Sequence, residues 1–195
     1  KFCNSGFRNS DGVILFVLLN TDLFNVSTVG VNLDVRNTEA STNPLISAAA
    51  GWDGTLATPL SSAEYYFATS LKVYDGLGDS HDITTYYDRT SNPNEWEYLV
   101  TCDPSEDVRT GFSQAVKGSG ALMYGTITFD ATGNVAQITA NDVAAGGATA
   151  AITTATRGTT SYYTLRAAFL IDPISGNPVD QDIDYNFGAS WTAGV

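Results

Sequence analysis

The stretch EWEYLVT, residues 95–101, alternates polar and apolar side chains with the period of a β-strand. Trp96, Tyr98 and Val100 fall on one face, and the glutamates fall on the other. One buried and one polar face is typical of strands in antiparallel sheets, which pack a single side against a core. The stretch therefore predicts a β-strand in which Trp96 is a core residue and not part of a sugar-binding face.

The same alternation recurs along the chain, whereas no window keeps the i, i+3, i+4, i+7 spacing of an amphipathic helix. Further strands are predicted at residues 29–35, 71–74, 83–87, 122–129, 162–170 and 183–187. Turn sequences separate them at short intervals, as in GLGD at 76–79 and DPISGNP at 172–178. The pattern predicts an all-β fold, an antiparallel β-sandwich or barrel-like domain with long loops.

Two stretches lack this periodicity. Residues 36–62 and residues 140–160 are predicted to be long loops or connectors. The second is rich in alanine, but Gly146 and Gly147 argue against a helix of more than a short turn.

The charge of the chain limits its partners. It carries 21 acidic and 9 basic residues, a formal net charge of -12 and a pI near 4.1. Binding to nucleic acid or to an anionic membrane needs clusters of Lys and Arg, so neither partner is expected. The longest apolar run, residues 13–19, is far shorter than the roughly 20 residues that span a bilayer. The start lacks the pattern of a secretory signal, and the sequence is expected to be a piece of a longer protein.

The stretch YDGLGDSHDITTYY, residues 74–87, contains the only histidine of the chain. A catalytic triad needs a nucleophile beside this base. The adjacent hydroxyl of Ser80 is badly placed, because consecutive residues of a strand point to opposite faces. His81 is therefore interpreted as a polar residue at the entry to a strand, and no catalytic residue is predicted.

Metal ligation in the same stretch is also not expected. Asp75, Asp79 and Asp82 lack the ligand order and the final glutamate of a calcium-binding loop, and one histidine cannot build a zinc site. We interpret these aspartates as caps of backbone N–H groups in an Asx-stabilised turn. Cys3 and Cys102 are expected to be unpaired. No cofactor or metal site is predicted, and no pair of carboxylates stands out as a glycosidase site.

Residues 69–107 resemble a signature of the bacterial flagellar hook protein, in which a Val-Tyr/Phe-Asp turn precedes a Gly-x-x-His-Asp segment and two aromatic strands. The matching residues are Val73, Tyr74, Asp75, Leu77, Gly78, His81, Asp82, Tyr86, Tyr87 and Trp96. Two later segments resemble the same family in the same order. GTITFDATGNVAQI at 125–138 is similar to its Phe-Asp hairpin, and IDYNFGAS at 183–190 is similar to its exit strand.

The resemblance implies a structural protein and not an enzyme. Hook proteins are subunits of the curved, flexible tube that links the basal body to the filament and transmits torque. The chain would correspond to the middle of such a protein, without its terminal helical segments. It would divide into residues 1–45, a strand segment and connector of an adjoining inner β domain, and residues 46–195, the outer β domain.

The expected partners are copies of the same protein in a helical tube and neighbouring axial proteins, outside the cell, while the fragment alone is expected to be monomeric. Some hook proteins carry Lys–Cys crosslinks, but the surroundings of Cys102 do not match that motif, so a spectator cysteine is expected. Two alternatives stay open: another axial protein, such as a distal rod or hook-cap component, and an extracellular β-sandwich binding module. The binding module predicts an exposed aromatic patch or a calcium site, and the hook interpretation predicts neither.

Overall fold

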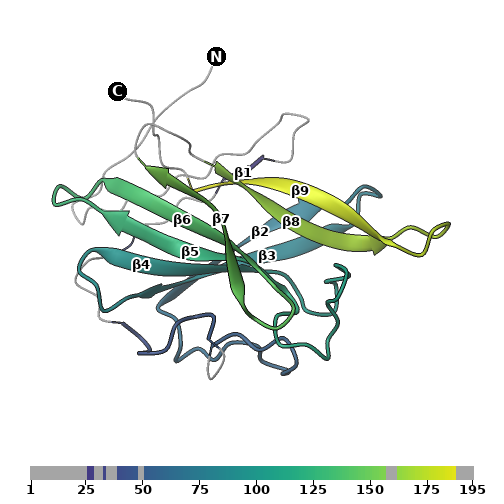
Figure 1. Cartoon of the computed structure of the whole chain (residues 1–195), viewed down its shortest axis with the longest axis horizontal. Helices are drawn as coiled ribbons and strands as arrows, with labels where there is room; N and C mark the ends of the chain where they lie inside the picture. Colours follow the sequence, from purple (N-terminus) through teal and green to yellow (C-terminus); the bar gives the residue numbers. More distant parts are fainter. Residues whose placement is uncertain (1–25, 29–32, 34–38, 48–50, 157–161, 188–195) are drawn as a thin grey trace, which may run out of the picture.

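The computed structural model describes residues 26–28, 33, 39–47, 51–156 and 162–187 (Figure 1). Six strands form one antiparallel sheet in the order β2-β3-β4-β5-β6-β7. Their bounds are β2 Phe67–Tyr74, β3 Ser80–Arg89, β4 Glu95–Thr101, β5 Ala121–Phe129, β6 Val135–Val143 and β7 Thr149–Thr156. Each strand pairs with its neighbour in sequence, so the sheet is a meander of hairpins.

A second sheet has the order β1-β9-β8, with β1 Val26–Thr28, β8 Tyr162–Ile171 and β9 Pro178–Asn186. β8 and β9 form an antiparallel hairpin, whereas β1 runs parallel to β9. β8 contacts β5 and β6, and Figure 1 shows the β8–β9 hairpin crossing the larger sheet. Two sheets enclosing one core confirm the prediction of an all-β, sandwich-like domain.

The core between the sheets is formed by alternate residues of the strands. Trp96, Tyr98 and Val100 all lie in it, as the alternation in EWEYLVT predicted. The tyrosines of this core keep their hydroxyl groups hydrogen-bonded: Tyr98 donates to the carbonyl of Thr139 at 2.6 Å, and Tyr163 to that of Ile138 at 2.7 Å. These bonds link residues of both sheets to β6, which stiffens the sandwich.

The opposite, outer face of the six-stranded sheet is covered by loops. A smaller apolar cluster lies there, made of Leu45, Trp52, Leu60, Leu99, Ala121 and Val143. Trp52 donates from Nε1 to the carbonyl of Ser119 at 2.8 Å, which joins the loop before β2 to the loop before β5. Of residues 36–62, the described ones contain no strand beyond an isolated bridge between Ile46 and Gly51, which confirms a long loop. Its role as a connector to another domain stays a prediction.

The prediction of a loop over residues 140–160 is wrong. β6 continues to Val143, a tight turn follows, and β7 returns from Thr149. The turn is closed by the N–H of Gly147, which donates to the carbonyl of Ala144 at 2.8 Å, and Gly147 has a φ of 80°. A residue without a Cβ adopts this φ without strain. The glycines therefore mark a hairpin turn and not a break in structure.

Other strand boundaries also differ from the predictions. β2 begins at Phe67 instead of residue 71, and β9 begins at Pro178 instead of residue 183. β1 was not predicted, and of the predicted strand at 29–35 only Leu33 lies within the described residues. Pairing of the backbone with a neighbouring strand extends β2 and β9 beyond their apolar cores.

Candidate functional site

The turn between β2 and β3 is fixed by the carboxylate of Asp75. Its Oδ1 accepts hydrogen bonds from the backbone N–H groups of Leu77 and Asp79, each at 2.9 Å, and the N–H of Asp75 donates to the carbonyl of Asp79 at 2.9 Å. Gly78 takes the left-handed conformation, with a φ of 93°. This geometry confirms the predicted Asx turn. Asp82 takes no part in it, because its carboxylate pairs with Lys72 at 2.8 Å on the surface.

His81 is the first buried residue of β3, and both of its ring nitrogens face carboxylates. Nδ1 lies 2.9 Å from Oε2 of Glu106, and Nε2 lies 3.3 Å from Oδ2 of Asp75. The ring also stacks on Phe169 of β8, with centroids 4.0 Å apart. Burial alone would raise the pKa of Asp75, but the backbone N–H of Asp79 and the ring of His81 outweigh it and lower that pKa. His81 therefore joins the turn, the loop before β5 and the second sheet.

The arrangement around His81 offers no nucleophile. Ser80 is exposed on the opposite face of β3, as the alternation predicted. Because both ring nitrogens already bond to carboxylates, the ring has no free position from which to accept a proton from a substrate. The absence of a catalytic residue stays a prediction. Around His81, the described residues place no nucleophile that would contradict it.

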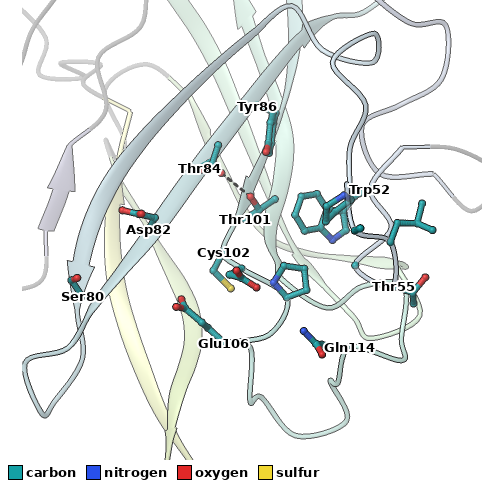
Figure 2. Close-up of a pocket in the computed structure, with 16 residues that line it drawn as sticks. Trp52, Thr55, Ser80, Asp82, Thr84, Tyr86, Thr101, Cys102, Glu106 and Gln114 are labelled. Atoms are coloured by element: carbon teal, nitrogen blue, oxygen red, sulfur yellow. Dashed lines mark hydrogen bonds between the residues drawn. The ribbon is translucent and has the colours of Figure 1, made fainter.

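An open groove of about 690 Å³ lies on the outer face of the six-stranded sheet. Figure 2 shows its floor along β3, formed by Ser80, Asp82, Thr84 and Tyr86, with Trp52 on one side and Glu106 on another. Thr101 donates to the carbonyl of Thr84 at 3.1 Å across this floor.

The carboxylates of the groove already have partners within the chain. Asp82 bonds to Lys72, Glu106 to His81, and Asp103 accepts from the N–H and hydroxyl of Ser105 at 2.8 and 2.7 Å. The carboxylates of this groove are therefore held by partners within the chain and do not converge as free groups on a ligand.

Cys102 lies in the wall of this groove but is buried and unpaired. Burial raises the pKa of its thiol far above the usual value, and the nearby Asp107 raises it further. Only the thiolate is a strong nucleophile or metal ligand, so Cys102 is an inert core residue. This confirms the expectation of an unpaired cysteine at this position; Cys3 lies outside the described residues.

In the part of the chain that the structure describes, no group of three or more His, Cys, Asp or Glu side chains is arranged to hold a metal ion. Within the same residues, no helix has the length and apolar character needed to cross a bilayer.

Three buried carboxylates, which the sequence interpretation did not single out, hold loops to the outer face of the sheet. Asp88 of β3 accepts from the N–H groups of Ala40 at 2.8 Å and Ser41 at 3.1 Å. Its cross-strand neighbour Glu97 accepts from the N–H of Leu45 at 3.2 Å and from the hydroxyl of Tyr124 at 2.8 Å. The two carboxylates together fix the incoming segment 39–45.

The third buried carboxylate, Asp107, organises the loop before β5. It forms a bidentate ion pair with Arg109, at 2.9 Å to Nε and 2.7 Å to Nη2, and accepts from the N–H of Gly120 at 2.8 Å. The guanidinium also donates to the carbonyl of Ala121 and lies 3.8 Å from the ring centroid of Phe112. A bidentate pair with its other bonds satisfied is a stable way to bury both charges.

Comparison with known proteins now identifies the family. Residues 33–194 match the family described as "Flagellar basal body protein FlaE D2 domain". The chain belongs to this family. Its membership confirms the resemblance to the flagellar hook protein that the motifs around His81 and the two later segments predicted. The match also covers residues 108–120, for which the sequence showed no family motif.

A solved structure, "32 kDa Fragment of the Flagellar hook protein FlgE from Caulobacter crescentus", is similar to this FlaE D2 domain, with 14% sequence identity and a TM-score of 0.39. The match covers 70% of this chain and 43% of the fragment, so it spans less than half of the fragment's length. No curated protein matches the chain.

Proposed function

We propose that the chain is the outer β domain of a structural subunit of the bacterial flagellar hook. The observation that carries this proposal is the match of residues 33–194 to the FlaE D2 domain family. In the full protein, the subunit would repeat in a helical tube outside the cell, bend as it transmits torque, and contact neighbouring axial proteins. Residues 1–45 would lead from an adjoining inner domain, and residues 46–195 would form the outer domain.

The fold supports a mechanical role. The two sheets share one core, and three aromatic rings of that core, Tyr98, Tyr163 and Tyr185, each meet Phe187 edge to face, with centroids 4.6, 6.1 and 5.0 Å apart. Close-packed interiors resist compression and transmit strain. The incoming segment is anchored at Asp88 and Glu97, so a force on the preceding chain reaches the sheet directly.

Deletion of the gene that contains this chain tests the proposal. Cells without it should be non-motile, and electron microscopy should show basal bodies with complete rods but neither hooks nor filaments. The intact gene, supplied in trans, should restore all three features. Loss of the distal rod instead would assign the protein to the rod, and polymerised but uncapped hooks would assign it to the hook cap. Normal hooks and motility would contradict every flagellar role and favour the extracellular binding module.

A further inference from the structure

Two buried carboxylates lie directly opposite each other on the outer face of the six-stranded sheet. Asp88 of β3 and Glu97 of β4 are cross-strand partners, and they are only 0% and 4% exposed. The Cβ atoms of such partners are about 5 Å apart, and like charges at this spacing destabilise a sheet. Two carboxylates in one buried site are therefore most stable when one of them keeps a proton. The chain that covers this pair is residues 39–47, which we name the strap.

The strap is attached to the sheet through the two carboxylates. The N–H groups of Ala40 and Ser41 donate to Asp88 at 2.8 and 3.1 Å, and the N–H of Leu45 donates to Glu97 at 3.2 Å. The side chain of Leu45 is fully buried in the outer apolar cluster. Because these hydrogen bonds end on titratable groups, the attachment of the strap depends on how many of those groups are charged.

The surroundings of Glu97 oppose a second negative charge at this site. Burial is the largest cause that raises the pKa of Glu97, to about 7, and the charges of Asp88 and of Glu39 in the strap raise it further. Hydrogen bonds from Tyr124 of β5 and from the N–H of Leu45 favour the charged form but do not outweigh these causes.

The other charged residues next to the pair do not offset its repulsion. Arg89 follows Asp88 in the chain, but its cross-strand partner is Trp96 of the inner core, so it lies toward the opposite face of β3. Glu95 shares the outer face of β4 with Glu97 and accepts from the side chains of Thr90 and Asn92, each at 2.8 Å. Within β3 and β4, no cation therefore lies on the outer face beside the pair.

The chain that follows the strap is held in a different way. Trp52 donates from Nε1 to the carbonyl of Ser119, and the N–H of Gly54 donates to the carbonyl of Lys117, both at 2.8 Å. A backbone carbonyl does not titrate, so this part of the loop should stay attached at any pH at which the sheet is folded. The strap is the part of the loop whose attachment can change by itself.

We propose that the strap opens more readily as the pH rises, because the Asp88–Glu97 pair holds it with one negative charge in mild acid and with two in mild alkali. With a proton on Glu97, the carboxyl group still accepts the N–H of Leu45 and repels Asp88 less. Opening admits water to this group, which then loses its proton without the cost of burial. The proposal is independent of the proposed function, because it concerns how the chain closes on itself.

The direction of the effect follows from linkage. The pKa of Glu97 is about 7 under the closed strap and returns toward 4.5 in water. A raised pKa gives stability that is complete below the lower value and is lost as the pH rises through the higher one. In the open form, the first attachments of the chain to the sheet are those of Trp52 and Gly54 instead of those to Asp88. A force on the preceding chain would then enter the domain at a different point.

Amide hydrogen exchange of the 195-residue chain, measured by NMR, tests the proposal when each rate is divided by the intrinsic rate at the same pH. Protection of the N–H groups of Ala40, Ser41 and Leu45 should fall roughly 30-fold between pH 5 and 8 and level off above pH 7. Protection of the N–H of Gly54 should stay nearly constant. In the same samples, the Cδ resonance of Glu97 should titrate near pH 7, where the fall levels off.

Two variants separate Glu97 from other titrating groups. Glu97→Gln should abolish the fall, because an amide oxygen accepts from the N–H of Leu45 but the group cannot ionise. Glu95→Gln is the matched control, since Glu95 lies on the same face of the same strand but bonds to Thr90 and Asn92 instead of to the strap. It should keep the fall of the wild type.

Three outcomes would overturn the proposal. The first is strap protection in the wild type that does not change with pH, or a Cδ resonance of Glu97 that titrates below pH 5. The second is a fall that persists in Glu97→Gln, which would assign it to another group. The third is an equal fall at Gly54 and in β4, which would show that the whole domain loosens and that the strap is not a separate unit. The wild-type measurements decide the question even if Glu97→Gln does not fold.

Discussion

The two faces of the six-stranded sheet are buried in different ways. The inner face meets the second sheet through apolar and aromatic side chains, and its polar groups are mainly hydroxyls that bond across the core, such as those of Thr85 and Tyr185. The outer face is covered by loops, and its apolar cluster is small. There, the buried carboxylates of Asp88 and Glu97 bind the backbone N–H groups of the covering segment.

The difference shows what each face depends on. The inner face is stabilised by the volume and shape of its side chains, because strands pair their own backbones and leave few polar groups to satisfy. A loop has no such partner for its N–H groups, so a loop that lies on a sheet needs acceptors from the sheet. We expect substitutions on the inner face to unfold the whole domain and substitutions on the outer face to release a loop.

Trp96→Ala should have the largest effect. The side chain is fully buried on the inner face, and removal of a buried tryptophan costs about 3 to 5 kcal/mol of unfolding free energy. Urea denaturation, followed by fluorescence and by circular dichroism, should show a single transition in both signals, at a lower urea concentration than in the wild type. Trp96→Phe is the control. Nε1 of Trp96 has no hydrogen-bond partner, so phenylalanine loses volume but no hydrogen bond and should cost less than half as much. Equal losses for both variants would contradict packing as the cause.

Asp88→Ala should act locally on the outer face. It removes the acceptor of the Ala40 and Ser41 N–H groups, and two hydrogen bonds to a charged group are together worth about 3 kcal/mol. Hydrogen exchange should become much faster at residues 39–45 and stay slow in β4 and β5. Asp82→Ala is the matched control. That carboxylate lies on the same face of β3 but pairs with the exposed Lys72 at the surface, so its loss should leave the unfolding free energy and the exchange at residues 39–45 almost unchanged. Uniformly faster exchange across the sheet would contradict the distinction between the two faces.

The inner face could be predicted from the sequence, and the outer face could not. In EWEYLVT the apolar residues mark the core, as the structure confirms. The same alternation assigned Glu97 to a polar, outward face, yet Glu97 is buried because the 39–62 loop covers it. Local periodicity records which residues share a face, and it contains no information on whether a distant loop will cover that face.

β7 shows a second limit. Its sequence TAAITTAT has no contrast between apolar and polar faces, so the strand is specified by the turn at Gly147 and by backbone pairing with β6. Around His81, the sequence predicted the Asx turn correctly from residue types that favour it. It could not predict the partner Glu106, which is 25 positions away, or the stacking on Phe169, because both contacts depend on the packing of the two sheets.

Glu97→Gln should give the smallest effect, and one that depends on pH. Burial is the main reason that the pKa of Glu97 is raised to about 7, and the charge of Asp88 raises it further. The hydrogen bond from Tyr124 lowers this pKa but does not outweigh burial. The folded state therefore holds a proton that the unfolded state, with a pKa near 4.5, has already lost. Stability from this group is present below the unfolded pKa and is lost as the pH rises through 7, by about 2 kcal/mol between pH 5 and 8.

Urea denaturation at several pH values should show that loss of unfolding free energy in the wild type and not in Glu97→Gln. The variant should therefore become more stable relative to the wild type as the pH rises. Tyr124→Phe sharpens the test. It removes a hydrogen bond that favours the charged carboxylate, and it should move the midpoint of the loss to higher pH. On the inner face no such dependence is expected from Trp96→Phe, which changes no titratable group. The opposite outcome is a difference in unfolding free energy between Glu97→Gln and the wild type that stays constant from pH 5 to 8. It would show that Glu97 is charged in the folded state over this range, as an exposed carboxylate would be. The contrast between the two faces would then be lost.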